Sequence, residues 1–209
     1  MPDFKREKAN IYLSSQRCIC MDDQNLLQTI KNADMKSVEG ASDELWDYRD
    51  QYYRNALMIS AMYGRTDLIE FFARKYDHVD DRDIEGNTAL MWAVRNNRIE
   101  SARSIISMKC SVDLPDNSGN TPLCWAIIFG YTDMVKLLIS SGSNINVKNA
   151  EGDTPAILAA KYGRVQCLKM LIEAGCDLKA RNNTGQNVWR AAEVFGRKEI
   201  SDLLGSSLR

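Results

Sequence analysis

Few residues of this 209-residue chain could support catalysis. The chain has one histidine, His78. A Ser–His or Cys–His nucleophile would have to use it, and no recognisable nucleophile motif surrounds any candidate serine or cysteine. We therefore expect His78 to be an exposed loop residue, and the catalytic interpretation is the weaker alternative.

The six cysteines do not form a metal site by their spacing. Cys18 and Cys20 come closest to a ligand pair, but structural zinc needs four ligands and no second pair exists. We interpret them as two reduced thiols in an N-terminal tail. Cys124 and Cys167 fall among apolar helix positions and are predicted to be small core residues. We predict no metal, no cofactor and no enzymatic activity.

The overall charge also narrows the function classes. Lys and Arg total 27 against 28 Asp and Glu, so there is no strong positive field to attract nucleic acid. Apolar runs are short and interrupted by charge, which predicts no membrane insertion. The N-terminus shows no secretory signal, and scattered cysteines fit a reducing compartment, so we expect a cytoplasmic location.

The chain repeats itself with a period of 33 residues. A first column of positions, each 33 residues after the last, holds Asn55, Thr88, Thr121, Thr154 and Asn187. Nine residues later a second column holds Gly64, Asn97, Gly130, Gly163 and Gly196, and five residues before the first stand Asp50, Asp83, Asp116, Asn149 and Asn182. Small residues fill the interval: Ser60, Ala61, Ala93, Ala126, Ala159, Ala160, Ala191 and Ala192.

Each column has a physical interpretation. Threonine followed by proline begins a helix, because the hydroxyl can cap free N–H groups and proline loses no hydrogen bond in the first turn. Glycine or asparagine suits the left-handed residue that ends this helix. A second helix follows, with an apolar pair on its buried face. The Asp/Asn-x-x-Gly segment makes a tight projecting turn.

These residues together closely resemble the ankyrin repeat over about residues 22–209. The resemblance implies an all-α solenoid of stacked helix–turn–helix units with projecting β-hairpin loops and polar capping repeats. The histidine that usually follows Thr-Pro-Leu in the family is absent from every copy, where Met58, Met91, Cys124, Ile157 and Arg190 stand instead. Its hydrogen-bond network is expected to be missing or rewired.

The period divides the chain into segments. We predict an N-terminal tail over 1–20, a degenerate N-capping helix pair over 21–49, and a C-capping repeat over 182–209. Between them lie four ankyrin repeats, over 50–82, 83–115, 116–148 and 149–181. The outer helix of the last unit carries Arg197, Lys198, Glu199 and Asp202, and polar end units keep such a stack soluble.

The resemblance implies that partners bind on the concave face, made of loop tips and the exposed edge of the first helices. Aromatic, methionine and arginine side chains are enriched at protein interfaces. On this basis we predict a partner-binding set made of Tyr52, Tyr63, Arg82, Ile84, Glu85, Arg95, Ile128, Phe129, Lys161 and Tyr162. Such a groove suits a peptide with apolar anchors and some acid.

Several residues near this face have two interpretations. The basic column Arg49, Arg82, Lys148 and Arg181 could face a partner, or its charges could be offset by the neighbouring aspartates. Trp92 and Trp125 could fill the seam between stacked helices or contact a partner, and the first is preferred, while Trp189 is predicted to be core. Asn146 resembles an asparagine that some ankyrin arrays offer to a hydroxylase, although a turn-stabilising role is preferred.

The most consistent function is a non-catalytic protein-interaction module, an adaptor, scaffold or inhibitor that is monomeric on its own and binds another protein or peptide. Two alternatives stay open. The chain could be the regulatory or substrate-recruiting subunit of an enzyme, or a pathogen effector acting on host proteins.

Overall fold

Ten helices in five pairs make up the part of the chain that the computed structural model describes, residues 30, 48–73 and 79–206. The pairs are α5 (Ala56–Tyr63) with α6 (Thr66–Ala73), α7 (Ala89–Arg95) with α8 (Ile99–Ser107), α9 (Pro122–Phe129) with α10 (Thr132–Ser140), α11 (Pro155–Tyr162) with α12 (Val165–Glu173), and α13 (Val188–Val194) with α14 (Lys198–Ser206). Outside the described residues lie His78, Cys18, Cys20 and nearly all of the predicted segment 21–49.

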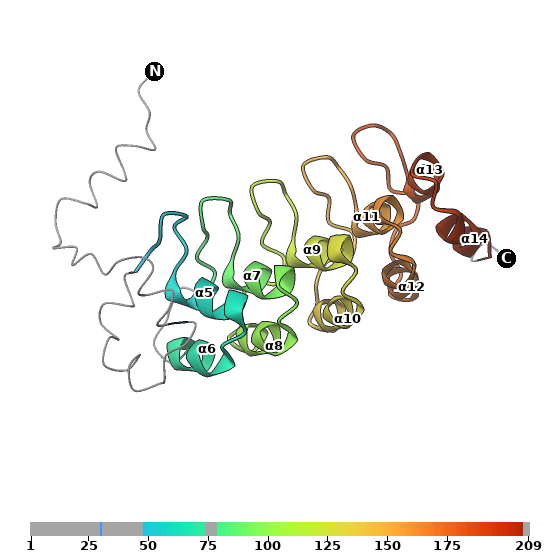
Figure 1. The fold of residues 1–209 in the computed structure, drawn as a ribbon. Helices are drawn as coiled ribbons and strands as arrows, with labels where there is room; N and C mark the ends of the chain where they lie inside the picture. The colour runs from blue at the N-terminus through green and yellow to red at the C-terminus, as the bar shows by residue number, and fades with distance from the viewer. Residues whose placement is uncertain (1–29, 31–47, 74–78, 207–209) are drawn as a thin grey trace, which may run out of the picture.

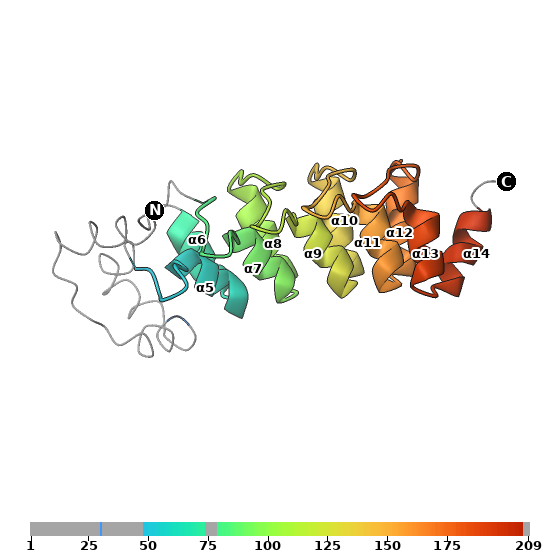
Figure 2. The same cartoon turned by 90° about the horizontal axis from the view of Figure 1, so that it is seen from above.

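The pairs stack side by side into an elongated array (Figures 1 and 2). The odd-numbered helices form an inner row and the even-numbered helices an outer row, and each helix contacts the next one in its own row. A loop projects from the inner row before each odd-numbered helix. The fold is the all-helical solenoid that the sequence predicts.

The inner helices begin where the 33-residue period places them. Each is capped by the side chain of Asn55, Thr88, Thr121, Thr154 or Asn187, which accepts a hydrogen bond from the backbone N–H three residues later. This bond pairs one of the N–H groups that a helix start leaves without a partner. Pro122 and Pro155 occupy the first turn of α9 and α11.

The inner helices also end as predicted. Gly64, Asn97, Gly130, Gly163 and Gly196 all have a positive φ, between 51° and 80°. Arg164 lies over Gly130 so closely that an added Cβ would be 3.0 Å from its Cδ, and its guanidinium donates to the Ile128 carbonyl at 2.8 Å. Arg98 and Arg197 repeat this contact over Gly64 and Gly163. The arginine thus pairs a carbonyl that the preceding helix end leaves free.

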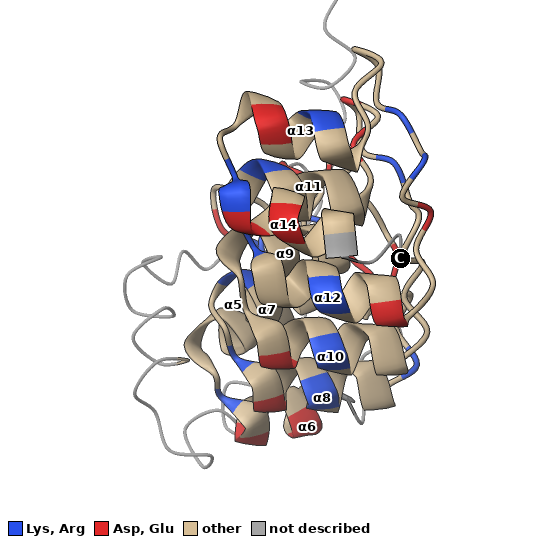
Figure 3. Cartoon of the chain, turned by 90° about the vertical axis from the view of Figure 1, so that its right-hand side faces the viewer, with Lys and Arg blue, Asp and Glu red and all other residues tan. Residues whose placement is uncertain are grey.

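The core runs continuously between the two rows. On the outer helices one column of fully buried residues recurs with the period: Phe72, Ile105, Leu138, Leu171 and Leu204. Met58, Met91, Cys124 and Ile157, at the position of the missing histidine, are also buried. Apolar packing has therefore taken the place of a buried polar side chain there. Charges of both signs are interspersed over the outer helices and loops (Figure 3).

Candidate partner-binding surface

The projecting loops are tight turns built on one repeated hydrogen-bond pattern. In each loop one side-chain oxygen of the Asp/Asn column accepts from the backbone N–H groups two and four residues later, as Asp83 does from Glu85 and Asn87 at 2.9 and 2.8 Å. The same pair of bonds recurs at Asp50, Asp116, Asn149 and Asn182. The sequence predicts β-hairpin loops, but the described residues contain no strand, because each loop closes as a turn.

Backbone hydrogen bonds join each loop tip to the next. The Ile84 N–H donates to the Tyr52 carbonyl at 3.0 Å, and three further bonds of this kind continue along the row, ending at Asn183 and Glu151. The close approach needs glycine in the turn, since a Cβ on Gly119 would be 2.6 Å from the Ala150 nitrogen. The loops therefore hold their tips in a fixed row beside the inner helices.

The second side-chain oxygen of the loop aspartates binds a residue of the same unit. In the first loop Asp50 pairs with Arg54 at 2.6 Å. In the next two loops the indole N–H of a tryptophan takes the place of the arginine: Trp92 donates to Asp83 at 2.9 Å and Trp125 to Asp116 at 2.8 Å.

The last two loops have asparagine at this position and make a different bond. The side-chain amide donates backwards to the preceding unit, from Asn149 to Asn120 and from Asn182 to Asp153. An amide offers N–H groups where a carboxylate offers a second acceptor. The bond therefore runs within a unit in the first three loops and between units in the last two.

Arginine and aromatic side chains alternate along the inner face. The guanidinium of Arg54 lies over Tyr52 and Trp92, with centroid distances of 4.9 and 5.2 Å. Arg95 lies over Trp92 and Trp125 at 5.3 and 4.5 Å, donates to Asn87 at 3.0 Å and faces Glu85 at 3.5 Å. Contacts of this kind stabilise by about 0.5–1 kcal/mol each at exposed sites.

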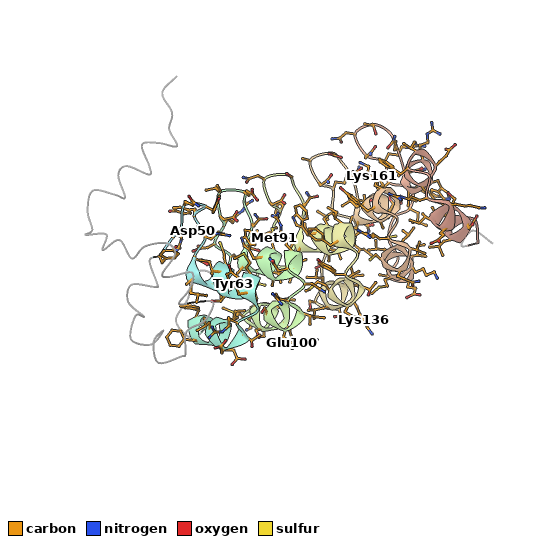
Figure 4. The ribbon with its side chains drawn as sticks, in the orientation of Figure 1. Asp50, Tyr63, Met91, Glu100, Lys136 and Lys161 are labelled. Carbon is orange, nitrogen blue, oxygen red and sulfur yellow. The ribbon has the colours of Figure 1, made fainter. Side chains whose placement is uncertain are left out.

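Lys161 is the charged group of α11 that faces the loops (Figure 4). Its ammonium hydrogen-bonds Asp153, which is fully buried, and reaches Glu151 at 3.2 Å. Burial lowers the pKa of Lys161, but hydrogen bonds and charge from Asp153 and Glu151 outweigh burial and raise the pKa above its usual value. We call Arg54, Trp92, Arg95, Trp125 and Lys161, each bound to a loop acid, the carboxylate-bound set.

The basic column is also occupied by contacts within the chain. Arg82 donates to the Gly86 carbonyl at 3.1 Å and to the Pro115 carbonyl at 2.5 Å. Lys148 and Arg181 likewise donate to loop carbonyls, and Arg49 pairs with Asp81 at 2.6 Å. These bonds go to loop carbonyls and to Asp81, and none of them goes to the turn aspartates proposed from the sequence as the balancing charges. Arg49, Arg82 and Lys148 each join one loop to the next, whereas the Arg181 bond stays within its own loop.

A second group of side chains on this face is apolar and exposed. It comprises Tyr52, Tyr53, Ile84, Phe129, Tyr162, Val194 and Phe195, which are 38–58% exposed. We call these the exposed apolar set. The first three are on loop tips, and the other four are at the C-terminal ends of α9, α11 and α13. They are the large apolar residues that the described chain exposes, and the outer helices contribute none of them.

The ten residues predicted from the sequence thus fall into three groups. Tyr52, Ile84, Phe129 and Tyr162 belong to the exposed apolar set. Arg95 and Lys161 belong to the carboxylate-bound set, with Glu85 as the partner of Arg95, and Arg82 links two loops. Tyr63 and Ile128 are partly buried and pack against the core.

Sequence reasoning left Tyr53, Val194 and Phe195 out of the predicted set. Phe195 stands in the same column as Phe129 and Tyr162, so the period could have found it. Tyr53 occupies the glycine column of the turn, where the other four copies have no side chain to offer a partner.

The tryptophans that had two interpretations now have defined places. Trp92 and Trp125 are partly buried against the core, and their indole N–H groups hydrogen-bond the loops. Trp189, predicted as core, is partly buried and lines an open hollow at the last unit together with Arg181 and Arg190. The Asn146 side chain accepts from the Asp177 N–H at 2.8 Å, which joins two successive outer turns.

The described cysteines are free thiols. Cys124 and Cys167 are buried, as predicted for small core residues. Burial raises the pKa of Cys110 to about 12 and that of Cys176 to about 11. Because the thiolate is the nucleophile, these thiols are poorly reactive. The described residues contain no group of three or more potential metal ligands and no helix long and apolar enough to cross a membrane.

Comparison with known proteins gives one family. A sequence model described as ankyrin repeats, in three copies, matches residues 20–116, 57–149, 104–182 and 141–207. A stretch of 78 residues is 73% identical to ankyrin repeat protein Ta0196 of Thermoplasma acidophilum, whose name carries the family assignment as provisional. That stretch covers 37% of this chain and 38% of the relative, so the similarity spans well under half of either protein.

Proposed function

Since this chain belongs to the ankyrin-repeat family, whose members are general protein-interaction modules, we propose that it is a non-catalytic adaptor, scaffold or inhibitor. In this proposal it binds a partner protein through the inner face, and the exposed apolar set makes the main contact.

The distribution of exposed apolar side chains carries this proposal. Clustered exposed apolar residues commonly mark interaction sites. Here they gather at loop tips and inner-helix ends and are not found on the outer helices of the described chain. Tyrosine and phenylalanine bury a large area with few rotatable bonds, which suits them to an interface.

The set forms two rows, one on loop tips and one at the ends of inner helices. Tyr52, Tyr53 and Ile84 lie at loop tips of the first two described units, whereas Phe129, Tyr162 and Phe195 lie at helix ends of the last three. A partner that contacts both rows crosses the face obliquely, from the loop tips at one end to the helix ends at the other. We therefore expect an extended segment or a broad surface rather than a small molecule.

Affinity capture from native cell extract tests this function. Wild type is compared with Phe129→Ala/Tyr162→Ala, which we expect to lose about 2 kcal/mol or more of binding free energy. The control is Lys136→Ala/Lys169→Ala, which removes exposed residues of outer helices. Circular dichroism first checks that all three chains are folded.

The expected result is one protein captured by wild type and by the control but not by the Phe129→Ala/Tyr162→Ala variant. Equal capture by all three would contradict the placement on the inner face. Loss with the control alone would move the site to the outer helices. An enzyme among the captured proteins would favour a regulatory or substrate-recruiting subunit over an adaptor.

A further inference from the structure

A hollow of about 330 Å³ opens on the inner face between the fourth and fifth described helix pairs. Val194 and Phe195, from the end of α13, form its apolar side. Glu151 and Lys161 lie on the other side, and Asn182, Asn183, Thr184 and Gln186 complete the lining. Most of the surface that these residues turn into the hollow is apolar, so the hollow can take up a large apolar side chain.

The two exposed apolar side chains of the hollow stand on a helix end that packs against the core. Phe195 is 46% exposed and Val194 is 51% exposed, and both stand on the turn that ends α13 beside the buried Ala191 and Ala192. A partner side chain inserted there would cover them without moving the helix. Such fixed pockets commonly concentrate the binding energy of an interface.

One ammonium serves two carboxylates at the hollow. Lys161 hydrogen-bonds Asp153 and reaches Glu151 at 3.2 Å. Asp153 is fully buried and holds the ammonium in place, together with the Asn182 amide that it accepts from. The Glu151 side chain is 73% exposed. Glu151 therefore presents a carboxylate to solvent at the edge of the hollow.

We propose that this hollow receives a large apolar side chain of the partner protein, and that a lysine or arginine beside it in the partner sequence pairs with Glu151. This inference rests on the proposed function and adds the chemistry of the bound segment. The sequence alone predicted a partner with some acidic residues, whereas this inference predicts a basic one. The reason is that Arg95 and Lys161 already bind acids of this chain.

Selection from a library of random peptides displayed on phage, against the immobilised full chain, tests the inference. We expect enriched peptides to carry Phe, Leu, Met or Trp with Lys or Arg within two positions. Synthetic versions of these peptides are then titrated by fluorescence anisotropy against wild type, Phe195→Ala and Glu151→Gln. Glu199→Gln, which neutralises an exposed carboxylate of outer helix α14, is the matched control.

Phe195→Ala should weaken binding about tenfold or more, as truncation of an anchor contact does. Glu151→Gln should weaken it about threefold to tenfold, because the lost ion pair is at an exposed edge. The control should bind as wild type does. Repeating the selection on Glu151→Lys should replace the basic residue of the enriched peptides by an acidic one.

Other results overturn the inference in distinguishable ways. One such result is a set of peptides that lack a basic residue and whose affinity falls with Phe195→Ala but not with Glu151→Gln. It would refute the pairing with Glu151 while leaving binding on the inner face intact. Enriched peptides whose affinity is unchanged by Phe195→Ala, Tyr162→Ala and Phe129→Ala would refute the proposed function as well. A selection that enriches no peptide would also count against both.

Discussion

Lys161 and Tyr162 are neighbours on α11, and their side chains are in opposite situations. The Lys161 ammonium binds the fully buried Asp153, whereas the Tyr162 ring is 45% exposed. The same contrast separates the carboxylate-bound set from the exposed apolar set over the whole inner face. Residues of the first set hold the loops to the helices. The fold makes little use of the exposed surface of the second, which is therefore the surface available to a partner.

Charged residues on the inner face of this ankyrin array are not all available to a partner. From the sequence, Arg82, Arg95 and Lys161 are as plausible for binding as the aromatic residues beside them. In the structure each of the three donates to an acid or a carbonyl of the same chain. A charged residue at a variable position can therefore belong to the scaffold, and substitutions can distinguish the two sets.

The largest expected effect on stability comes from Lys161→Ala. The substitution leaves the buried Asp153 carboxylate without its ammonium partner, and breaking such a pair is costly. Because Lys161 is itself partly exposed, we expect the free energy of unfolding to fall by about 2–3 kcal/mol, measured by urea denaturation. Lys136→Ala on the outer helix α10 is the control and should change it by less than about 0.5 kcal/mol.

The Lys161 pair also predicts a pH dependence. The pKa of Lys161 is raised in the folded chain, so its stabilising contribution is complete below the unfolded lysine pKa of about 10.4. It is lost as the pH rises through the higher folded-state value. The difference in stability between wild type and Lys161→Ala should therefore persist at neutral pH and shrink in alkaline solution. A difference that keeps its neutral-pH value throughout the alkaline titration of lysine would contradict this assignment.

Trp125→Phe comes next. It keeps an aromatic ring but removes the indole N–H that donates to Asp116 at 2.8 Å. A hydrogen bond to a charged acceptor contributes about 1.5–3 kcal/mol, and since Asp116 keeps its two backbone donors we expect the lower end of that range. Urea denaturation measures the loss, and Trp189→Phe, at a partly buried tryptophan of the last unit, serves as the substitution of the same type. A stability equal to wild type would remove Trp125 from the carboxylate-bound set.

Tyr53→Gly should act in the opposite direction. Tyr53 has a φ of 62° at the turn position where four other loops have glycine. Holding a residue with a side chain in this region costs about 1 kcal/mol, and the Arg49 guanidinium 5.9 Å from the ring offsets part of it. We expect stability to rise by up to about 1 kcal/mol while partner binding weakens. A fall in stability would show that the Tyr53 ring supports the fold.

Tyr162→Ala and Phe195→Ala should have the smallest effects on stability. Both rings are nearly half exposed, so each substitution should lower the free energy of unfolding by less than about 0.5–1 kcal/mol. Tyr162 is a cleaner test than Phe129, because Phe129 also stacks between Trp125 and Tyr131 at 5.7 and 5.5 Å. Thermal denaturation followed by circular dichroism gives the comparison, and a large drop in the midpoint would place these rings in the scaffold.

The fold could be predicted from the sequence because its signals are local and repeated. Thr121 with Pro122 begins α9, and Gly130 ends it, through backbone requirements that hold in every unit. The exception at Asn97 is consistent with the same physics. Asn97 takes the glycine position, and the following unit has Tyr131 where other units have an arginine packed over glycine.

The site could be predicted only in part. Whether a side chain is free to bind a partner depends on which loop or helix residues it already contacts, and these contacts form only in the folded chain. Nothing in the local sequence shows that Lys161 meets Asp153, since the pairing depends on how the loop folds back on the helix. One signal was present, however. Asp83 and Asp116 are each followed nine residues later by a tryptophan, whereas Asn149 and Asn182 are followed by Leu158 and Ala191. Aspartate thus stands in the loops where the same unit offers a donor, an indole for Asp83 and Asp116 and the Arg54 guanidinium for Asp50.

Site-specific photo-crosslinking tests the central claim most directly. A photoreactive phenylalanine analogue is placed at Tyr162 in one chain and at Lys136, on the outer helix α10, in another, and both are irradiated in native extract. We predict a defined crosslinked protein from position 162 and none from position 136. Crosslinks from position 136 alone, or the same products from both positions, would contradict binding through the inner face.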